Sequence, residues 1–163
     1  MLLGDYFHTI PIETLLQKQF GNSTDEYHRA SMRGKRLIVC SEIPENRKLN
    51  EPQAKDMVGG ELITARQPYG EPFTFAPVHK LVLVGNHKLR ITGTDEGMWR
   101  RICLIPFDYK VPEGKEIPME GMLRRFKEEL PGILNFGIEG YRKFKAEGIE
   151  WPDVCKQAIM EYR

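Results

Sequence analysis

The sequence is short of cysteine, of long apolar runs and of net charge. Its three cysteines contain no C-x-x-C pair, so a thiolate metal site is not expected and reduced thiols are. No apolar run reaches the roughly 18 residues that span a bilayer, and the N-terminus lacks the apolar stretch of a signal peptide. These absences predict a soluble protein of the cytoplasm with no membrane partner.

The charges nearly balance, with 24 Lys and Arg against 23 Asp and Glu, which leaves a formal net charge of +1. Bulk charge is therefore no argument for binding nucleic acid or a membrane, and any basic surface must be local. The histidines show no spacing typical of metal ligands and are interpreted as surface or core residues: His8, His28, His79 and His87.

What the chain does have is enough apolar sequence to fold around a core. Its 163 residues, 40% hydrophobic and 29% charged, suit one domain or one large piece of a larger domain. The patterns predict helices at 12–20 and 23–32, a buried strand at 37–40, a helix at 51–58, a hairpin around 68–70, buried strands at 81–84 and 102–107, and helices between 122 and 147 and at 152–162.

The order of these elements predicts an α/β fold. A mostly parallel sheet with a β-hairpin insertion would be followed by a helical appendage, because the pattern changes at Val111-Pro112. We therefore expect a division between residues 1–111 and 112–163.

Glu42 ends the first buried strand, in "LIVCSE", and Glu45 follows three residues later. A carboxylate at the carboxyl end of a central strand is where open α/β sheets place ligand chemistry, and it could hold Mg²⁺ through water. The alternative is an ordinary loop glutamate at the end of a strand.

Asn86 and two arginines flank the next two apolar runs. Asn86 ends "LVLVGN" and could orient a water or touch a phosphate, although asparagine after glycine is also a common turn former. Arg100 and Arg101 begin "ICLIPF" and could fork onto phosphate oxygens, or could be a solvated basic pair at a strand edge.

Taken together and in this order, these features resemble the C-terminal half of the superfamily-three helicases, and more narrowly the phage and plasmid primase–helicases related to those of poxviruses. The likeness covers nearly the whole chain. The matching segments are "KRLIVCSEIPENRKLNE", "KDMVGGELITARQPYGEPFTFAP", "HKLVLVGNHKLRI", "GTDEGMWRRICLIPF" and the helical "LPGILNFGIEGYRKF". The resemblance implies an AAA+-like P-loop NTPase that uses ATP and Mg²⁺ and works as a hexamer around single-stranded DNA during replication, often fused to a primase domain.

Carried over by position, the resemblance gives each catalytic candidate a role. The Walker B acidic residue, which would also face the metal, falls on Glu42, with Glu45 as a second candidate. The sensor asparagine falls on Asn86. The arginine finger falls on Arg100, with Arg101 as the less favoured choice.

The family's DNA-gripping hairpin falls on residues 59–75. Arg66 and Tyr69 are the phosphate or stacking groups near its tip, and Lys88 is a further candidate for DNA contact.

The resemblance also implies a phosphate loop of the form G-x-x-x-x-G-K-[ST], and no such string occurs here. In the family the loop precedes a segment like "LLGDYFHTIPIETLL", so we expect this chain to be a fragment or a gene remnant. We expect no tight binding of ATP or Mg²⁺ by this chain alone.

A rival interpretation is a non-catalytic DNA-binding or oligomerisation module. It would use the hairpin and the local basic groups Lys80, His87, Lys88 and Arg90.

Overall fold

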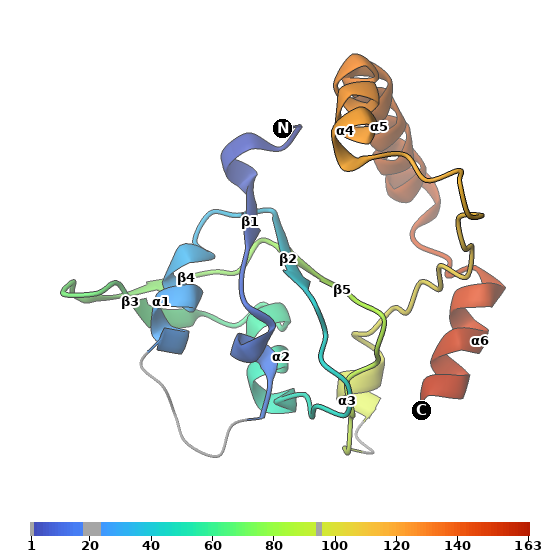
Figure 1. Cartoon of the computed structure of the whole chain (residues 1–163). Helices are drawn as coiled ribbons and strands as arrows, with labels where there is room; N and C mark the ends of the chain where they lie inside the picture. The colour runs from blue at the N-terminus through green and yellow to red at the C-terminus, as the bar shows by residue number, and fades with distance from the viewer. Residues whose placement is uncertain (1, 18–23, 94–95) are drawn as a thin grey trace. The chain divides into compact units, whose positions relative to one another are not determined.

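The computed structural model describes residues 2–17, 24–93 and 96–163 (Figure 1). The chain divides into two compact units, which are described separately. The sheet unit comprises Leu3–Ile102 and the last two residues, and the helical unit comprises Cys103–Glu161 together with the N-terminal Leu2.

Three parallel strands form the sheet, in the order β1-β2-β5. β1 is Phe7–Thr9, β2 is Leu37–Ser41 and β5 is Lys80–Val84. Ser41 lies opposite Val84, so β2 and β5 end together at their carboxyl ends. The parallel sheet, the hairpin and the helices confirm the predicted mixed α/β fold, which is consistent with part of a P-loop-type sheet.

The central strand β2 supplies the middle of the core. Ile38 and Cys40 are both 0% exposed, and they share one core cluster with Leu15, which comes from the short 3-10 helix η2 (Ile12–Leu15). Burial, with a smaller contribution from the Glu13 carboxylate, raises the pKa of the Cys40 thiol to about 12. Cys40 is therefore a protonated packing residue and not a reactive thiol.

The predicted hairpin is confirmed. β3 (Ile63–Arg66) and β4 (Pro72–Phe75) form an antiparallel pair, and the turn between them is closed by the Gly70 N–H, which donates to the Gln67 carbonyl at 3.0 Å. Helix α1 (Thr24–Ser31) packs against β3. The base of the hairpin is therefore anchored while its tip extends away (Figure 1).

The helix predicted at 12–20 is wrong in the part that the structure describes. The 3-10 helix η2 ends at Leu15, and Leu16 forms an antiparallel bridge with Leu49. The next residue, Gln17, donates its N–H to the Lys48 carbonyl at 2.9 Å. Backbone pairing with the segment after β2 therefore overrides the helical spacing of the apolar side chains.

Residues 18–20 of that predicted helix lie outside the described part of the chain. The next predicted helix, at 23–32, is confirmed as α1, although its first expected residue also lies outside the described part.

The strand predicted at 102–107 is also wrong. These residues belong to no strand, and Phe107 is 90% exposed. An apolar run becomes a strand only when a neighbour takes its backbone hydrogen bonds, and among the described strands β5 pairs with β2 alone. For the same reason β5 is not the buried strand that the sequence predicts: it is an edge strand, and Val84 is 53% exposed.

The helical unit contains the predicted C-terminal helices. They are α4 (Met119–Glu128), α5 (Leu130–Glu147) and α6 (Asp153–Tyr162). Pro131 stands at the start of α5, where its missing N–H costs nothing, and Gly148 ends it with a φ of +79°. None of the described helices combines the length and the apolar character needed to cross a membrane.

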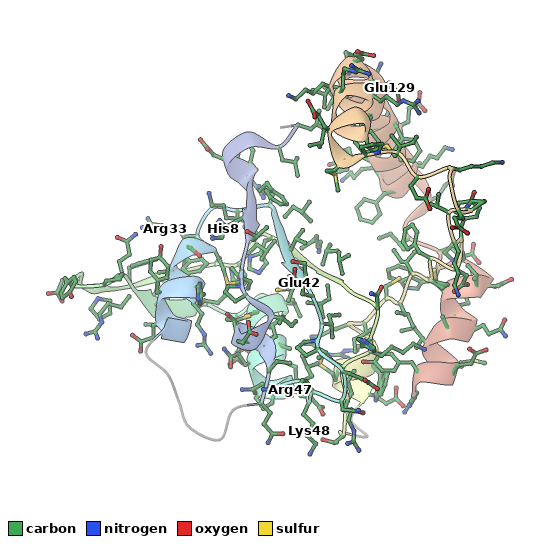
Figure 2. All side chains as sticks on the ribbon, in the orientation of Figure 1. His8, Arg33, Glu42, Arg47, Lys48 and Glu129 are labelled. Atoms are coloured by element: carbon green, nitrogen blue, oxygen red, sulfur yellow. The ribbon has the colours of Figure 1, made fainter. Side chains whose placement is uncertain are left out.

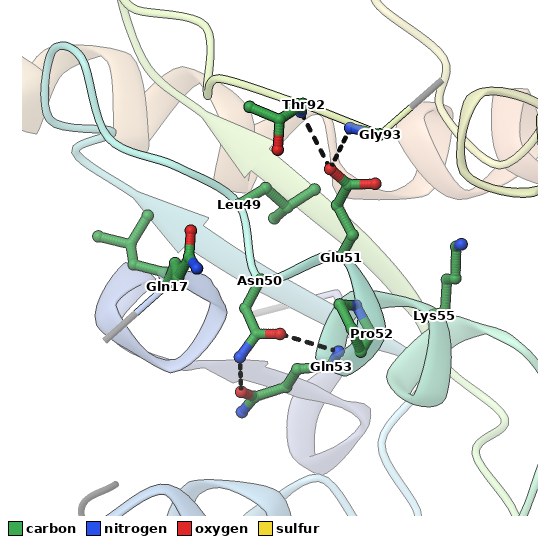
Figure 3. A pocket seen from close by; sticks show the side chains of 10 residues that line it. Gln17, Leu49, Asn50, Glu51, Pro52, Gln53, Lys55, Thr92 and Gly93 are labelled. Carbon is green, nitrogen blue, oxygen red and sulfur yellow. Dashed lines mark hydrogen bonds between the residues drawn. The ribbon is translucent and has the colours of Figure 1, made fainter. Parts of the chain in front are cut away.

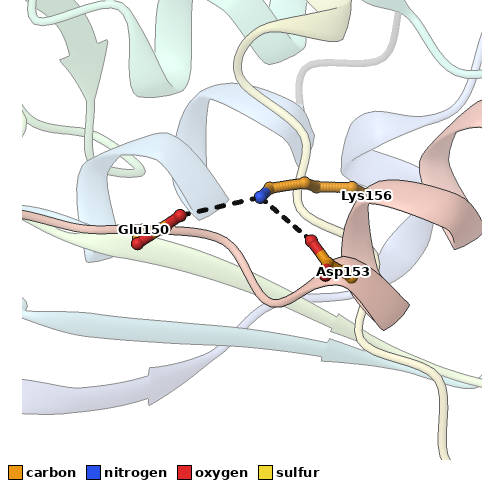
Figure 4. Close-up of polar contacts among 3 residues, drawn as sticks. All are labelled: Glu150, Asp153 and Lys156. Carbon is orange, nitrogen blue, oxygen red and sulfur yellow. Dashed lines mark hydrogen bonds and ion pairs between the residues drawn. The ribbon is translucent and has the colours of Figure 1, made fainter.

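The first turn of α6 carries a small ion-pair group (Figure 4). Lys156 Nζ lies 3.1 Å from Asp153 Oδ1 and 3.9 Å from Glu150 Oε1. Because all three side chains are largely exposed, these pairs contribute little to stability.

The structural division falls at Cys103, whereas the functional division between residues 1–111 and 112–163 stays a prediction.

Candidate functional site

Two predicted site residues leave the sheet at the same edge. Glu42 directly follows β2, and Asn86 follows β5 with only Gly85 between. Because Ser41 and Val84 are paired in a parallel ladder, the two segments emerge together at the carboxyl end of the sheet. Ligands of open α/β sheets bind at this edge. The structure therefore brings Glu42 and Asn86 to one place, where both are exposed.

A close backbone contact fixes these two segments against each other. A Cβ atom at Gly85 would lie 2.9 Å from both Cβ and Cγ1 of Ile43, which is closer than real Cβ atoms come. Glycine is therefore required before Asn86, and the contact partner Ile43 directly follows Glu42.

The backbone of Glu42 is strained. Its φ is +62°, in the left-handed region, which side chains other than glycine, asparagine and aspartate seldom adopt. Such a conformation costs on the order of 1 kcal/mol, and residues that adopt it cluster at active sites and ligand-binding segments. Figure 2 labels Glu42 where the chain leaves β2. The conformation favours a functional role for Glu42 over an ordinary loop position, and that role stays a prediction.

The second predicted carboxylate, Glu45, lies in an exposed turn beside Asn46, whose φ is +58°. In the described part of the chain, no three His, Cys, Asp or Glu side chains gather into a metal site. Mg²⁺ at nucleotide sites is held by one or two carboxylates together with water and substrate phosphates. A carboxylate such as that of Glu42 is the kind of group that such a shared set requires, and its role as a metal ligand stays a prediction.

Arg100 and Arg101 end a short helix and do not begin a strand, which corrects the prediction. The helix is α3 (Glu96–Trp99), and the Arg100 N–H continues it by donating to the Glu96 carbonyl at 3.0 Å. The Arg101 guanidinium donates to the Gly97 carbonyl. The Arg100 side chain is exposed and has no partner among the described residues, so it is the better placed of the two to reach a ligand.

Trp99 anchors the helix that carries these arginines. It is 7% exposed, and its indole Nε1–H donates to the Gly93 carbonyl at 3.2 Å. The Gly93 N–H in turn donates to Glu51 Oε1 at 2.8 Å, and the Thr92 N–H donates to the same oxygen at 3.0 Å. Trp99, which directly precedes Arg100, is thereby connected through Gly93 to the helix that begins at Glu51.

An open hollow of about 650 Å³ lies at the start of that helix, α2 (Glu51–Val58) (Figure 3). Asn50 caps the helix, because its Oδ1 accepts the Gln53 N–H at 3.3 Å and its Nδ2 donates to Gln53 Oε1 at 2.9 Å. Gln53 is 8% exposed, and its Nε2 has no partner in the described part of the chain. Lys55 also lines the hollow.

Sequence reasoning did not assign these residues to a site. The segment "NEPQ" places an asparagine before the helix and a proline at its start, which is typical of the beginning of a helix. It carried no signal that Glu51 bonds to a loop about 40 residues away.

The predicted DNA-contact residues lie on two different elements. Tyr69, at the hairpin tip, is fully exposed and has a φ of +60°. Arg66, at the end of β3, lies with its Nε 3.8 Å from Glu26 Oε2, and both side chains are 57% exposed. Lys88 is exposed on the segment after β5.

Comparison with known proteins adds two findings. A family model described as "Family of unknown function (DUF5906)" matches residues 2–101. A protein of Acanthamoeba polyphaga mimivirus that is named "Putative helicase" is 30% identical across 99% of this chain. The chain spans 18% of the length of that relative. The family match contains the sheet edge with Glu42 and Asn86, and also both arginines.

Proposed function

The chain belongs to the family of unknown function DUF5906, and we propose that it forms part of an ATP-dependent DNA helicase motor. Its likeness to a viral protein with helicase in its name supports a helicase-related function. We further propose that the motor uses ATP, that it is joined to a primase, and that it acts in phage or plasmid replication.

The observation that carries the proposal is the position of Glu42 and Asn86 at the same carboxyl edge of the sheet, just after the paired ends of β2 and β5. A carboxylate and an amide on neighbouring parallel strands can polarise and orient an attacking water beside a phosphate. The close approach of Gly85 to Ile43 keeps the two segments together at this edge.

ATP would supply the reactive phosphate and Mg²⁺ would neutralise its charge. The chain carries no G-x-x-x-x-G-K-[ST] loop, and a carboxylate cannot act on a phosphate that nothing holds. We therefore propose that a phosphate loop from a longer protein completes the site, and that this chain alone does not turn over ATP.

Arg100 would act on the nucleotide of a neighbouring subunit. Its exposed guanidinium has no partner in the described part of the chain, and Trp99 fixes the end of α3 from which it projects. A finger of this kind requires a ring, and we propose a hexamer around single-stranded DNA. The hairpin tip with Arg66 and Tyr69 would contact that strand. Such a motor would act where DNA is replicated, which we expect to be the cytoplasm.

A second candidate function is a non-catalytic DNA-binding or oligomerisation module. The missing phosphate-loop sequence favours it, because the hairpin and the basic groups after β5 need no nucleotide.

Sequencing the gene upstream of Met1 separates the two candidates. An in-frame G-x-x-x-x-G-K-[ST] followed by this chain supports the motor. A stop codon directly before Met1 supports the non-catalytic module. Measurable ATP turnover by the 163-residue chain that Glu42→Gln abolishes would contradict the proposal that a separate loop is needed.

A further inference from the structure

The segment after β2 lies between two other backbone segments of the sheet unit. On one side, the Gln17 N–H donates to the Lys48 carbonyl at 2.9 Å. On the other side, the Leu49 N–H donates to the Arg90 carbonyl at 3.0 Å, and the Arg90 N–H donates to the Arg47 carbonyl at 2.7 Å. This segment therefore has a fixed register.

That register places two cations side by side. Lys48 and Arg90 are partners in a parallel β-bridge, so their side chains leave the backbone in the same direction at neighbouring positions. Leu49 is 8% exposed and Leu89 is 3% exposed, and these buried neighbours keep the two cations turned towards solvent. Both cations are exposed, and Figure 2 labels Lys48 next to Arg47, which is also exposed.

No carboxylate neutralises this pair in the described part of the chain. The ion pairs found there involve neither Lys48 nor Arg90. The nearby Glu51 uses its Oε1 to accept the Thr92 and Gly93 N–H groups. Like charges at paired strand positions are destabilising, so an anion placed between them would relieve the repulsion.

We propose that Lys48 and Arg90 form a binding site for the phosphodiester backbone of a single DNA strand, separate from the hairpin. The two residues do not line the hollow at α2, and both are exposed on the ladder that joins their segments. A flat pair of cations suits a polyanion that passes across it, because each phosphate needs only charge and a donor.

Lys48 and Arg90 lie on the segments that follow β2 and β5. Along the chain, each comes a few residues after the carboxyl edge that carries Glu42 and Asn86. This inference goes beyond the proposed motor, which places DNA on the hairpin, and beyond the non-catalytic module, which uses Arg90 without its bridge partner Lys48. It does not depend on ATP hydrolysis, so its test is made without nucleotide.

The test is fluorescence anisotropy with a labelled oligo(dT) strand and the 163-residue chain, between about 50 and 200 mM salt. The double substitution Lys48→Gln with Arg90→Gln should weaken binding by about tenfold at the lowest salt. It should also flatten the dependence of log K on log salt by about 0.7 for each phosphate that the variant no longer neutralises. The control is Lys143→Gln with Lys145→Gln, two exposed residues of α5, which removes the same charge and should leave both quantities unchanged.

Circular dichroism and thermal unfolding keep the result interpretable. Removal of the like-charge pair should leave the folded state as stable as before or slightly more stable, because the repulsion is relieved. Lys48→Arg should retain most of the affinity, since it keeps the charge.

Several results would overturn the proposal. The unmodified chain could show no measurable binding at low salt, the control pair could lose as much affinity as the Lys48 and Arg90 variant, or that variant could keep the salt dependence of the unmodified chain. Displacement of the strand by equimolar inorganic tripolyphosphate would assign the pair to nucleotide phosphates and would also overturn it.

Discussion

Gly85 and Ile43 touch where β5 and β2 end, and a Cβ atom at Gly85 would lie 2.9 Å from the Cβ of Ile43. Gly85→Ala should therefore push apart the two segments that carry Glu42 and Asn86. We expect the free energy of unfolding to fall by about 1–3 kcal/mol, as for other overpacked sites, when measured by urea denaturation of the 163-residue chain.

The matched control for this change is Gly137→Ala. Gly137 lies inside α5, and nothing lies within 4 Å of its added Cβ. There alanine should stabilise the helix by about 0.5–1 kcal/mol because it loses less backbone entropy on folding. If both substitutions had the same effect, the close approach at the sheet edge would not be a constraint.

Tyr69 combines a strained backbone with full exposure at the hairpin tip. Tyr69→Gly should relax the left-handed conformation and leave the protein at least as stable, by up to about 1 kcal/mol. The same change should weaken binding to oligo(dT), since a stacked aromatic ring contributes about 1–3 kcal/mol per base.

Unfolding curves and anisotropy on the same Tyr69→Gly preparation check both parts of this prediction. A variant that keeps full affinity would remove Tyr69 from the DNA-contact residues, and the role of the hairpin would then depend on Arg66 alone.

His79 should make stability depend on pH. It is 6% exposed, and neither ring nitrogen has a partner in the described part of the chain. Burial is the largest influence and lowers its pKa; the nearby backbone of Met57, with which neither ring nitrogen forms a hydrogen bond, opposes this effect, and the Lys80 charge adds to it. The unfolded chain therefore binds the proton more readily than the folded chain, and the free energy of unfolding falls as the pH drops below about 6.5.

His79→Leu should flatten this decline, which one histidine can make no steeper than about 1.4 kcal/mol per pH unit. Some pH dependence should remain, because burial also lowers the pKa of His8. Urea denaturation at several pH values between about 5 and 7.5 measures the slope, and parallel profiles for the two proteins would contradict this account of His79.

The two arginines should separate in function. In a longer protein with a phosphate loop, Arg100→Ala should leave ATP binding nearly intact and lower turnover by about 10³–10⁵. Arg101→Ala should lower turnover less, since its guanidinium already donates to the Gly97 carbonyl. Mixing Arg100→Ala protein with a phosphate-loop mutant should recover part of the activity, because mixed rings contain intact composite sites. A loss of ATP turnover with Arg101→Ala but not with Arg100→Ala would assign the arginine finger to Arg101.

Local patterns predicted most of the elements of the fold. The alternating residues around Pro68 gave the hairpin, the apolar run at 37–40 gave β2, and Pro131 and Gly148 marked the ends of α5. Each of these signals acts within a few residues, so it can be read without knowing the tertiary structure.

The errors arose where distant backbone pairing decides the structure. Leu16 looked helical but pairs with Leu49, and the run at 102–107 looked like a strand but has no strand beside it. The strand at Phe7–Thr9 was missed because it is short and acquires its identity by pairing with β2. Periodicity cannot reveal which partner a segment will find.

In the candidate site, too, local features could be predicted and pairings between distant segments could not. The ends of two apolar runs marked Glu42 and Asn86 as candidates, and the structure places both at one edge because the parallel strands β2 and β5 end together. The bridge between Lys48 and Arg90 could not be predicted, because the two residues are joined by the register of segments that are far apart in sequence.

The most direct test of the central claim is steady-state ATP turnover by a protein that contains this chain behind its phosphate loop, measured with and without single-stranded DNA. The account predicts turnover that DNA stimulates and that Glu42→Gln lowers by at least about a hundredfold with ATP binding retained, while Glu45→Gln has a smaller effect. Unchanged turnover in the Glu42→Gln protein would contradict the assignment of the sheet edge as the site of hydrolysis.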